Sequence, residues 1–547
     1  MTDAAPLDVA PDTGHEEAAA RELIAAMMLA PNGQSSASVY ETGRLVSLAP
    51  WLVRHAERID HLLLTQAPTG GWGGPGGYAL VPTLSAVEAL LAALLRGDLR
   101  TPDDGEIHTR VVRALGPGLV RLRDLLAEPG LALPDLPAID LVVPALVESL
   151  NGHLARVAAG GRAELRRGPY DGPLPLPAGM GRGRLERVRE VLGSGDPVPE
   201  KIWHALEVGG PAARRATGAM VPGSGAVGAS PAATAAWIGT PDDAAAPALS
   251  YLEETVRQYG GPVPPASPIA VFERAWVLST LSRSGVPFPV PPRMLASLAD
   301  ALGPAGTPTG PGLPPDADTT SVTLSALARL GRPVPPSSLW AYDTGEHFCT
   351  WHGEDGASVT TNAHVLDALG WHATRTPAEP RLASAVERLT AWLCARQGPD
   401  GAWSDRWHAS PYYATCCAVL ALAEYGRGVR RDDALDRAAA WLLEEQRPDG
   451  SWGRWTGTVE ETAYALQALL STTRPADPRP LPHLHHGYRY LSTMEGRDGE
   501  PALWHDKDLY RPPLIVGAAV TAARYLVRLR MGLHPPGYVA GGLISAA

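Results

Sequence analysis

The 547-residue chain has very little lysine, and its acidic residues outnumber its basic ones. Only Lys201 and Lys507 are lysines among 47 basic residues, a bias that GC-rich coding produces by using arginine wherever either residue serves. The two lysines either occupy positions that need a compact ammonium group or survive by chance. The net charge of −11 argues against a nucleic-acid-binding protein, which needs a basic face.

Cysteines and long apolar runs are also scarce. The four cysteines, Cys349, Cys394, Cys416 and Cys417, show no metal-binding or disulfide spacing, which is typical of reduced thiols in a cytoplasmic protein. No uncharged apolar run reaches 18 residues, so we expect no membrane span. The first 13 residues lack the basic and apolar regions of a signal peptide.

Apolar residues recur at three- and four-residue spacing through most of the chain, which predicts an all-α fold. The clearest predicted helices are 16–29, 84–96, 110–126, 184–192, 320–330, 383–397, 434–446 and 460–470. No convincing run of alternating polar and apolar residues indicates a β-strand.

Three segments fit the pattern Gln-x-x-x-Gly-x-Trp. They are 66–72, 397–403 and 446–452. We predict that each ends a helix, turns at the glycine and buries the indole, while the Gln amide bonds backbone groups at the helix end. The last two copies are 49 residues apart, and such a period with two helices per unit indicates a closed α/α toroid. The distant first copy indicates a second toroid.

A Pro/Gly-rich loop, 306–315, runs into Asp316-Ala317-Asp318-Thr319-Thr320 at the start of a predicted helix. Two carboxyl groups at this spacing can keep one acid protonated, because burial and a neighbouring carboxylate both raise a carboxyl pKa. A neutral acid in an apolar pocket is what protonation of an alkene requires. Helix capping is the alternative, since Asp and Thr are favoured at helix N-termini.

The repeats and the Asp-x-Asp-Thr-Thr loop together resemble the class II terpene cyclases built from β and γ α/α-barrel domains. Further matching segments are 230–235, 271–276, 361–366 and 504–510. The resemblance implies two toroids, with the γ domain inserted after the first helix of the β domain. Residues 1–32 would form that first helix, 33–276 the γ domain, and 277–547 the rest of the β domain with the acid motif.

The resemblance also implies roles for the acid motif. Such enzymes protonate the distal alkene of a prenyl diphosphate and keep the diphosphate. Asp318 would be the general acid, Asp316 would hydrogen-bond and orient it, and Thr319 and Thr320 would complete the motif. Thr319 replaces the third acid of the common pattern, so it supplies a hydroxyl group without charge.

His204 is the candidate terminating base, because its segment is similar to one that supplies a deprotonating histidine in plant relatives. Their partnering asparagine, expected just before Pro268, is missing here. Asn362 and His364 are either structural or orient the two acids.

The diphosphate group of such a substrate needs cations or Mg²⁺. Lys507 is the first candidate and Arg511 a weaker one, and a surface lysine paired with Asp506 or Asp508 is the alternative interpretation of Lys507. Glu148 is a candidate Mg²⁺ ligand by resemblance.

Aromatic faces stabilise carbocations without reacting with them. The candidates for this role are Trp351, Tyr412, Tyr413, Trp504 and Tyr510.

The motif variant is most similar to that of bacterial drimenyl diphosphate synthases, which predicts cyclisation of farnesyl diphosphate to drimenyl diphosphate. The alternative is a copalyl-type cyclase acting on geranylgeranyl diphosphate, and the choice of a homodimer or a monomer is left open. A second alternative is a non-catalytic α/α-toroid binding protein. A protein prenyltransferase subunit would need a Zn²⁺ site that the cysteines do not supply.

A competing acidic motif matches the metal motif of diphosphate-ionising synthases and consists of Asp432, Asp433 and Asp436. However, acids at the start of a helix also complement the helix dipole.

Overall fold

The computed structural model describes residues 14–98, 105–160, 172–219, 223–354, 356–376, 379–473, 477–494 and 499–532. These residues are mostly helical, which confirms the all-α prediction. Their strands form two short hairpins: β1 (Thr307–Pro308) pairs with β2 (Pro315–Asp316), and β3 (Trp504–His505) pairs with β4 (Leu509–Tyr510). Every predicted helix is present, with ends that differ by a few residues.

The helices follow one another in two groups. The first group contains α1 (Gly14–Leu29), α2 (Val39–Leu48), α3 (His55–Leu64), α4 (Leu80–Arg96), α5 (Gly105–Ala127), α6 (Ile139–Ala158), α7 (Gly183–Gly193), α8 (Glu200–Trp203), α9 (Pro231–Ile238) and α10 (Ala246–Gln258). The second contains α11 (Ala270–Ser284), α12 (Pro292–Asp300), α13 (Ala317–Arg329), α14 (Val359–Arg375), α15 (Pro380–Ala395), α16 (Pro411–Tyr425), α17 (Val429–Glu444), α18 (Val459–Thr472), α19 (Leu481–Thr493) and α20 (Pro513–Arg530). Short 3₁₀ segments are η1 (Gly76–Ala79), η4 (Leu206–Ala213), η5 (Asp243–Ala245) and η6 (Ser337–Tyr342).

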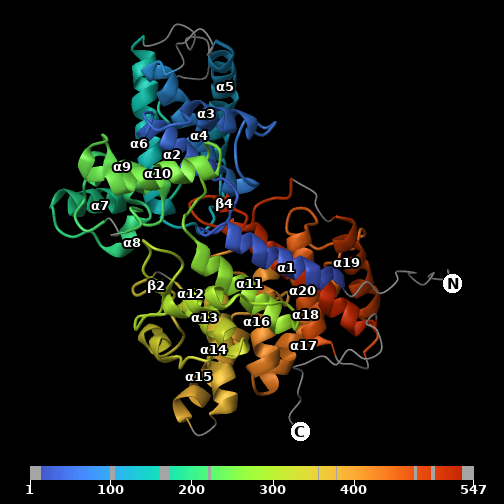
Figure 1. Cartoon of the computed structure of the whole chain (residues 1–547). Helices are drawn as coiled ribbons and strands as arrows, with labels where there is room; N and C mark the ends of the chain where they lie inside the picture. The colour runs from blue at the N-terminus through green and yellow to red at the C-terminus, as the bar shows by residue number, and fades with distance from the viewer. Residues whose placement is uncertain are drawn as a thin grey trace.

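The second group forms a closed α/α barrel, which we call the β domain. Its inner ring runs α11, α13, α14, α16, α18 and α20, and α20 packs back against α11. Outer helices return the chain between inner ones, so the inner helices point the same way and their N-termini meet at one end. Helix α1 packs on α20 and α11 although it comes first in the chain; Figure 1 shows this blue helix among the orange and red ones.

The remaining helices form a separate lobe, which we call the γ domain (Figure 1). Its ring includes α2, α4, α6, η4 and α9, and its apolar core lies between Tyr40 and Val263. The predicted boundary at residue 276 falls inside α11, because Phe272 and Trp276 pack in the β-domain core. The helical stretch 76–96 is long and apolar enough to cross a membrane. However, 89% of its most apolar 18-residue segment is buried within the protein, as is usual for a core helix.

The three Gln-x-x-x-Gly-x-Trp segments have the same structure, as predicted. In the third copy, Gln446 Nε2 donates to the carbonyls of Gly450 and His483 at 2.9 Å each, and Trp452 Nε1 donates to Leu442 O at 2.7 Å. The equivalent bonds occur in the copies at 66–72 and 397–403. Gly450 has φ +89°, and a Cβ atom there would lie 2.6 Å from His486 O, so only glycine fits. The repeats therefore join successive outer helices.

Candidate active site

Asp316 is the N-cap of α13 and is buried, with 2% of its surface exposed. Its Oδ1 accepts a hydrogen bond of 2.6 Å from the backbone N–H of Thr319, while the Thr309 hydroxyl lies 3.4 Å from Oδ2. Burial first, and the nearby Asp318 carboxyl second, raise the pKa of Asp316 to about 7. The capping alternative is therefore true of Asp316 and does not exclude an acid–base role.

The loop before α13 is held by its own hydrogen bonds. The Thr320 hydroxyl donates to Asp316 O at 2.5 Å and accepts from the backbone N–H of Thr307 at 2.8 Å, which joins the helix start to β1. Gly306 has φ +112°, and a Cβ atom there would lie 2.4 Å from the Thr320 hydroxyl oxygen. The Pro/Gly-rich sequence thus lets the loop close tightly over the acids.

Asp318 lies in the first turn of α13 and points toward α14. Its Oδ1 lies 2.6 Å from Nδ1 of His364, and 15% and 17% of the two side chains are exposed. Burial alone would lower the pKa of His364, but the attraction of Asp318 raises it well above its usual value. The contact with Asp318 thus favours the protonated form of His364, in which Nδ1 donates to Asp318.

A row of aromatic rings extends from His364 across the barrel. The Trp276 ring lies 5.6 Å from that of His364, and its Nε1 donates to the Tyr413 hydroxyl at 2.9 Å. The Tyr413 ring lies 4.8 Å from Trp504 and 5.1 Å from Tyr464. These four aromatic residues, which we call the aromatic wall, give the acid the π-rich surroundings that stabilise positive charge.

A buried carboxyl group lies at the far side of the aromatic wall. Glu460, with 1% of its surface exposed, accepts hydrogen bonds from Trp504 Nε1 at 2.7 Å and from His408 Nε2 at 3.1 Å. The Ser410 backbone N–H donates to His408 Nδ1, so the proton of a neutral His408 is on Nε2. Oε2 of Glu460 has no partner among the described residues.

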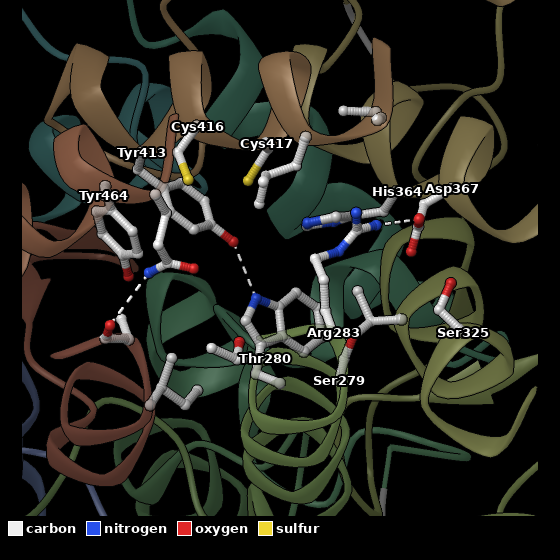
Figure 2. A pocket seen from close by; sticks show the side chains of 18 residues that line it. Ser279, Thr280, Arg283, Ser325, His364, Asp367, Tyr413, Cys416, Cys417 and Tyr464 are labelled. Atoms are coloured by element: carbon white, nitrogen blue, oxygen red, sulfur yellow. Dashed lines mark hydrogen bonds and ion pairs between the residues drawn. The ribbon is translucent and has the colours of Figure 1, made fainter. Parts of the chain in front are cut away.

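A small cavity lies inside the barrel beneath His364. Figure 2 shows Tyr413, Cys417 and His364 around it, with Arg283 and Asp367 forming an ion pair at one side. Its volume is about 80 Å³, which suffices for two or three water molecules at roughly 30 Å³ each.

A larger cleft of about 920 Å³ lies between the two domains. Arg187 and Lys201 line it from the γ domain, and Trp351, Arg406 and Trp407 line it from the β domain. The indole N–H groups of Trp351 and Trp407 are buried and have no acceptor among the described residues. The cleft therefore offers cations, of which Arg406 already pairs with Asp135 at 2.9 Å, and the carboxyl groups of Asp140 and Glu354 line it as well.

One backbone hydrogen bond joins the segment that lines the cleft to the acid loop. Trp351 follows Thr350, whose carbonyl accepts a hydrogen bond of 3.0 Å from the backbone N–H of Ala317. Ala317 separates Asp316 from Asp318.

Lys507 does not line this cleft, and its predicted contact with substrate is corrected. Its Nζ forms ion pairs with Glu41 and, at 2.9 Å, with Glu207, and it also contacts Ser230 Oγ at 3.0 Å. The side chain is completely buried, so no donor remains for a ligand. The surface-lysine alternative was wrong for the same reason.

Two other predicted roles do not match the contacts. His204 has both ring nitrogens occupied, with Nδ1 2.7 Å from Gly228 O and Nε2 2.9 Å from Asp506. Burial would lower its pKa, but Asp506 raises it, so the ring is not available to accept a proton. Arg511 pairs with Glu500 at 3.2 Å and does not line the cleft.

Among the predicted aromatic residues, Tyr413 and Trp504 belong to the aromatic wall, and the Tyr510 ring lies 6.3 Å from Trp504. Trp351 lines the cleft. Tyr412 instead stacks on Trp441 of the outer helix α17 at 4.8 Å, because neighbouring residues on an α-helix face different directions.

The predicted Mg²⁺ ligand, Glu148, is half-exposed and pairs with Arg189 at 2.8 Å. No three His, Cys, Asp or Glu side chains in the described ranges come close enough to hold a metal ion. The residues therefore do not form a preassembled Mg²⁺ site, and no step below uses the ion. Asp432 and Asp433 are exposed at the start of α17 and pair with Arg431 and Arg437, as expected for helix-dipole residues.

Sequence reasoning missed Trp276, Trp407 and Glu460. Trp276 lies within the matching segment 271–276, but one aromatic in an apolar helix does not indicate which way it faces. Glu460 follows the third repeat and resembles a helix N-terminal acid, which hid its burial.

Comparison with known proteins identifies the fold and the family. Residues 353–504 match the model of the squalene-hopene cyclase C-terminal domain, a segment that contains His364 and Glu460. The chain is 44% identical over 507 residues to ent-copalyl diphosphate synthase of Streptomyces sp. (strain KO-3988), covering 92% of this chain and 94% of that protein. The chain belongs to the class II terpene cyclase family.

Two further relatives cover nearly the whole chain. Labda-7,13-dienyl diphosphate synthase of Streptomyces clavuligerus is 39% identical over 554 residues, with 99% of both proteins covered. The solved structure of ent-copalyl diphosphate synthase from Streptomyces platensis superposes with a TM-score of 0.85 at 43% identity, covering 93% of this chain and 99% of that one. The cyclase is therefore an enzyme with the two-toroid fold that the repeats indicated.

Proposed function

We propose that this cyclase converts geranylgeranyl diphosphate to a bicyclic, copalyl-type diphosphate. The observation that carries the proposal is the pair of the buried Asp316 and the partly buried Asp318, of which Asp318 contacts His364 beside the aromatic wall. The names of the relatives support the diterpene substrate, since copalyl and labdadienyl diphosphates are diterpene diphosphates. They favour this alternative over the farnesyl diphosphate that the Asp-x-Asp-Thr-Thr motif suggested.

Asp318 is the proposed general acid. The pKa of Asp316 is raised to about 7, so near neutral pH the two carboxyls share a proton, which we assign to Asp318 in the reacting complex. The imidazolium of His364, at 2.6 Å from Asp318, favours the carboxylate that remains after proton transfer. The π electrons of the terminal alkene form a C–H bond to the proton, and the more substituted alkene carbon becomes a tertiary carbocation.

Ring closure then needs no further group from the protein except shape and charge. Two successive alkenes attack the cation, each forming one C–C bond, and the positive charge moves along the aromatic wall. Loss of one proton gives the final alkene, so the product is an isomer of the substrate. The C–O bond to the diphosphate stays intact. The buried carboxyl of Glu460 adds negative charge on the side opposite the acid.

The diphosphate is proposed to lie in the interdomain cleft and not beside Lys507, where the sequence analysis placed it. Arg187 and Lys201 would supply positive charge there. The connection from Trp351 through Thr350 to Ala317 supports a chain that runs from the cleft to the acid.

The substrate experiment compares two prenyl diphosphates. Purified protein incubated with geranylgeranyl diphosphate, then treated with phosphatase, is expected to give a bicyclic diterpene alcohol in mass spectrometry. Farnesyl diphosphate is expected to react at least tenfold more slowly. Faster conversion of farnesyl diphosphate would restore the drimenyl assignment, and release of inorganic pyrophosphate would contradict a class II reaction.

The cleft assignment predicts that Arg187→Gln raises KM for geranylgeranyl diphosphate about tenfold or more with little change in kcat. A charge-assisted hydrogen bond is worth about 1.5–3 kcal/mol, and it holds substrate and transition state alike. Arg479→Gln is the matched control, because that side chain is 80% exposed and pairs with Asp477. Unchanged KM in the Arg187 variant would place the diphosphate elsewhere.

The acid pair predicts that kcat/KM falls as the pH rises above neutral. Because the active form is protonated and the pKa of Asp316 is about 7, kcat/KM is expected to be level below about pH 7 and to fall roughly tenfold per unit above it. Asp316→Asn keeps a capping side chain but removes the neighbouring charge, so this fall should move to lower pH. A profile that rises through pH 7 in the wild type would contradict the assignment.

A further inference from the structure

The hairpin β3–β4 carries residues of opposite character at its tip and in its arms. Its tip, Asp506-Lys507-Asp508, enters the γ domain. Asp508 accepts hydrogen bonds from the Ser38 hydroxyl at 2.6 Å and from the backbone N–H of Tyr40 at 2.9 Å. The tip is thus bonded to the N-terminus of α2.

Lys507 forms the centre of this contact. Beside its ion pairs with Glu41 of α2 and Glu207 of η4, its Nζ donates to the carbonyl of His204 at 2.7 Å. None of its side chain is exposed, and its contacts come from three separate segments of the γ domain. A buried ammonium surrounded in this way fixes its position, since leaving would strand two buried carboxylates.

The arms of the same hairpin belong to the β domain. Trp504 precedes Lys507 by three residues, and its indole touches Tyr413, Phe272 and His408 at ring distances of 4.8, 5.7 and 5.2 Å. The turn is closed by a hydrogen bond of 3.0 Å from Asp506 N to Asp508 O. Such a short, bonded turn transmits the position of the tip to the indole.

We propose that Lys507 is a positioning residue through which the γ domain sets the place of Trp504 in the aromatic wall. The inference rests on the proposed cyclisation, but Lys507 itself does not touch the substrate. The γ domain then controls how far cyclisation proceeds, because a displaced indole no longer stabilises the second cation. This role also explains why position 507 keeps a lysine in an arginine-rich sequence. A compact ammonium fits the site between Glu41 and Glu207, and a planar guanidinium does not.

The test separates positioning from folding. Lys507→Met leaves both Glu41 and Glu207 without their ammonium partner, so the main probe is Lys507→Met/Glu207→Gln, which keeps the net charge and leaves Glu41 alone unpaired. We expect it to unfold in one transition like the wild type and to keep KM for geranylgeranyl diphosphate within twofold. Its bicyclic fraction should fall at least fivefold in favour of monocyclic or hydroxylated products. Arg479→Met is the control cation variant and should change nothing.

The product shift should match that of Trp504→Ala, and combining the variants should add little further change. Wild-type products from the folded Lys507→Met/Glu207→Gln protein would overturn the proposal. A tenfold rise in KM at constant kcat would also overturn it, because Lys507 would then act on the diphosphate.

A readout without substrate keeps this test distinct from the proposed reaction. The contribution of Trp504 to the near-UV circular dichroism is obtained by subtracting the spectrum of Trp504→Phe from that of the wild type. That difference should shrink at least twofold in the Lys507→Met/Glu207→Gln background. An unchanged difference spectrum would overturn the coupling, whereas failure of the wild type to convert geranylgeranyl diphosphate would overturn only the proposed function.

Discussion

Replacing Asp318 by Asn is expected to lower the cyclisation rate about 10⁴-fold, the upper end of what a general acid contributes. An alkene is a poor base, so the reaction has no other way to begin. Asn has the size of Asp and leaves the backbone bonds of Asp316 and Thr320 in place. Product formation from geranylgeranyl diphosphate at saturating substrate measures the effect.

The fold and the binding of substrate should survive this change. Thermal unfolding and substrate affinity by calorimetry are expected to stay close to the wild type, because the cleft and the barrel core are untouched. Asp432→Asn is the matched control, since Asp432 is 61% exposed and belongs to the competing acidic motif. If Asp318→Asn kept more than a tenth of the activity, the acid would have to be another group.

Trp452→Ala is expected to lower the free energy of unfolding by about 3–5 kcal/mol. The indole is completely buried in the β-domain core, and its Nε1 donates to Leu442 O at the end of α17. Alanine leaves a cavity and an unpaired carbonyl, so packing between α17, α18 and α19 is lost together with the hydrogen bond. Urea unfolding followed by far-UV circular dichroism gives the change.

Trp371→Ala provides the comparison for this second prediction. Trp371 is half-buried and stacks with Arg375, whose guanidinium lies 4.0 Å from the ring, so its loss should cost about 1 kcal/mol or less. Equal effects of the two substitutions would mean that the repeat tryptophans do not hold the barrel together.

The local features of this cyclase could be predicted because they depend on short stretches of chain. The glutamine, glycine and tryptophan of each repeat make their bonds within one turn and the next helix, so their spacing carries the geometry. Asp316 caps the helix that it begins, and the Pro/Gly-rich loop before it predicted a tight turn. Helical periodicity located the eight predicted helices for the same reason.

The failed predictions concern side chains whose partners are hundreds of residues away. Lys507 was assigned to the diphosphate because it lies in the family-like segment 504–510 and a diphosphate needs a cation, but Glu41 and Glu207 enclose it. His204 was assigned as a base, but Asp506 occupies its ring. Tyr412 and Tyr413 are adjacent, and only the packing of α16 decides that the second one faces the acid.

The sequence alone determined the helical class, the repeated turns and the position of the two carboxyls at the start of α13, since each follows from bonds between near neighbours. Tertiary structure alone decided which cations pair with buried acids, which indoles belong to the aromatic wall and which side chains line the interdomain cleft. Those outcomes depend on how the barrel closes and on how the inserted domain meets it, because burial and charge at a site are set by whatever segments the fold brings there.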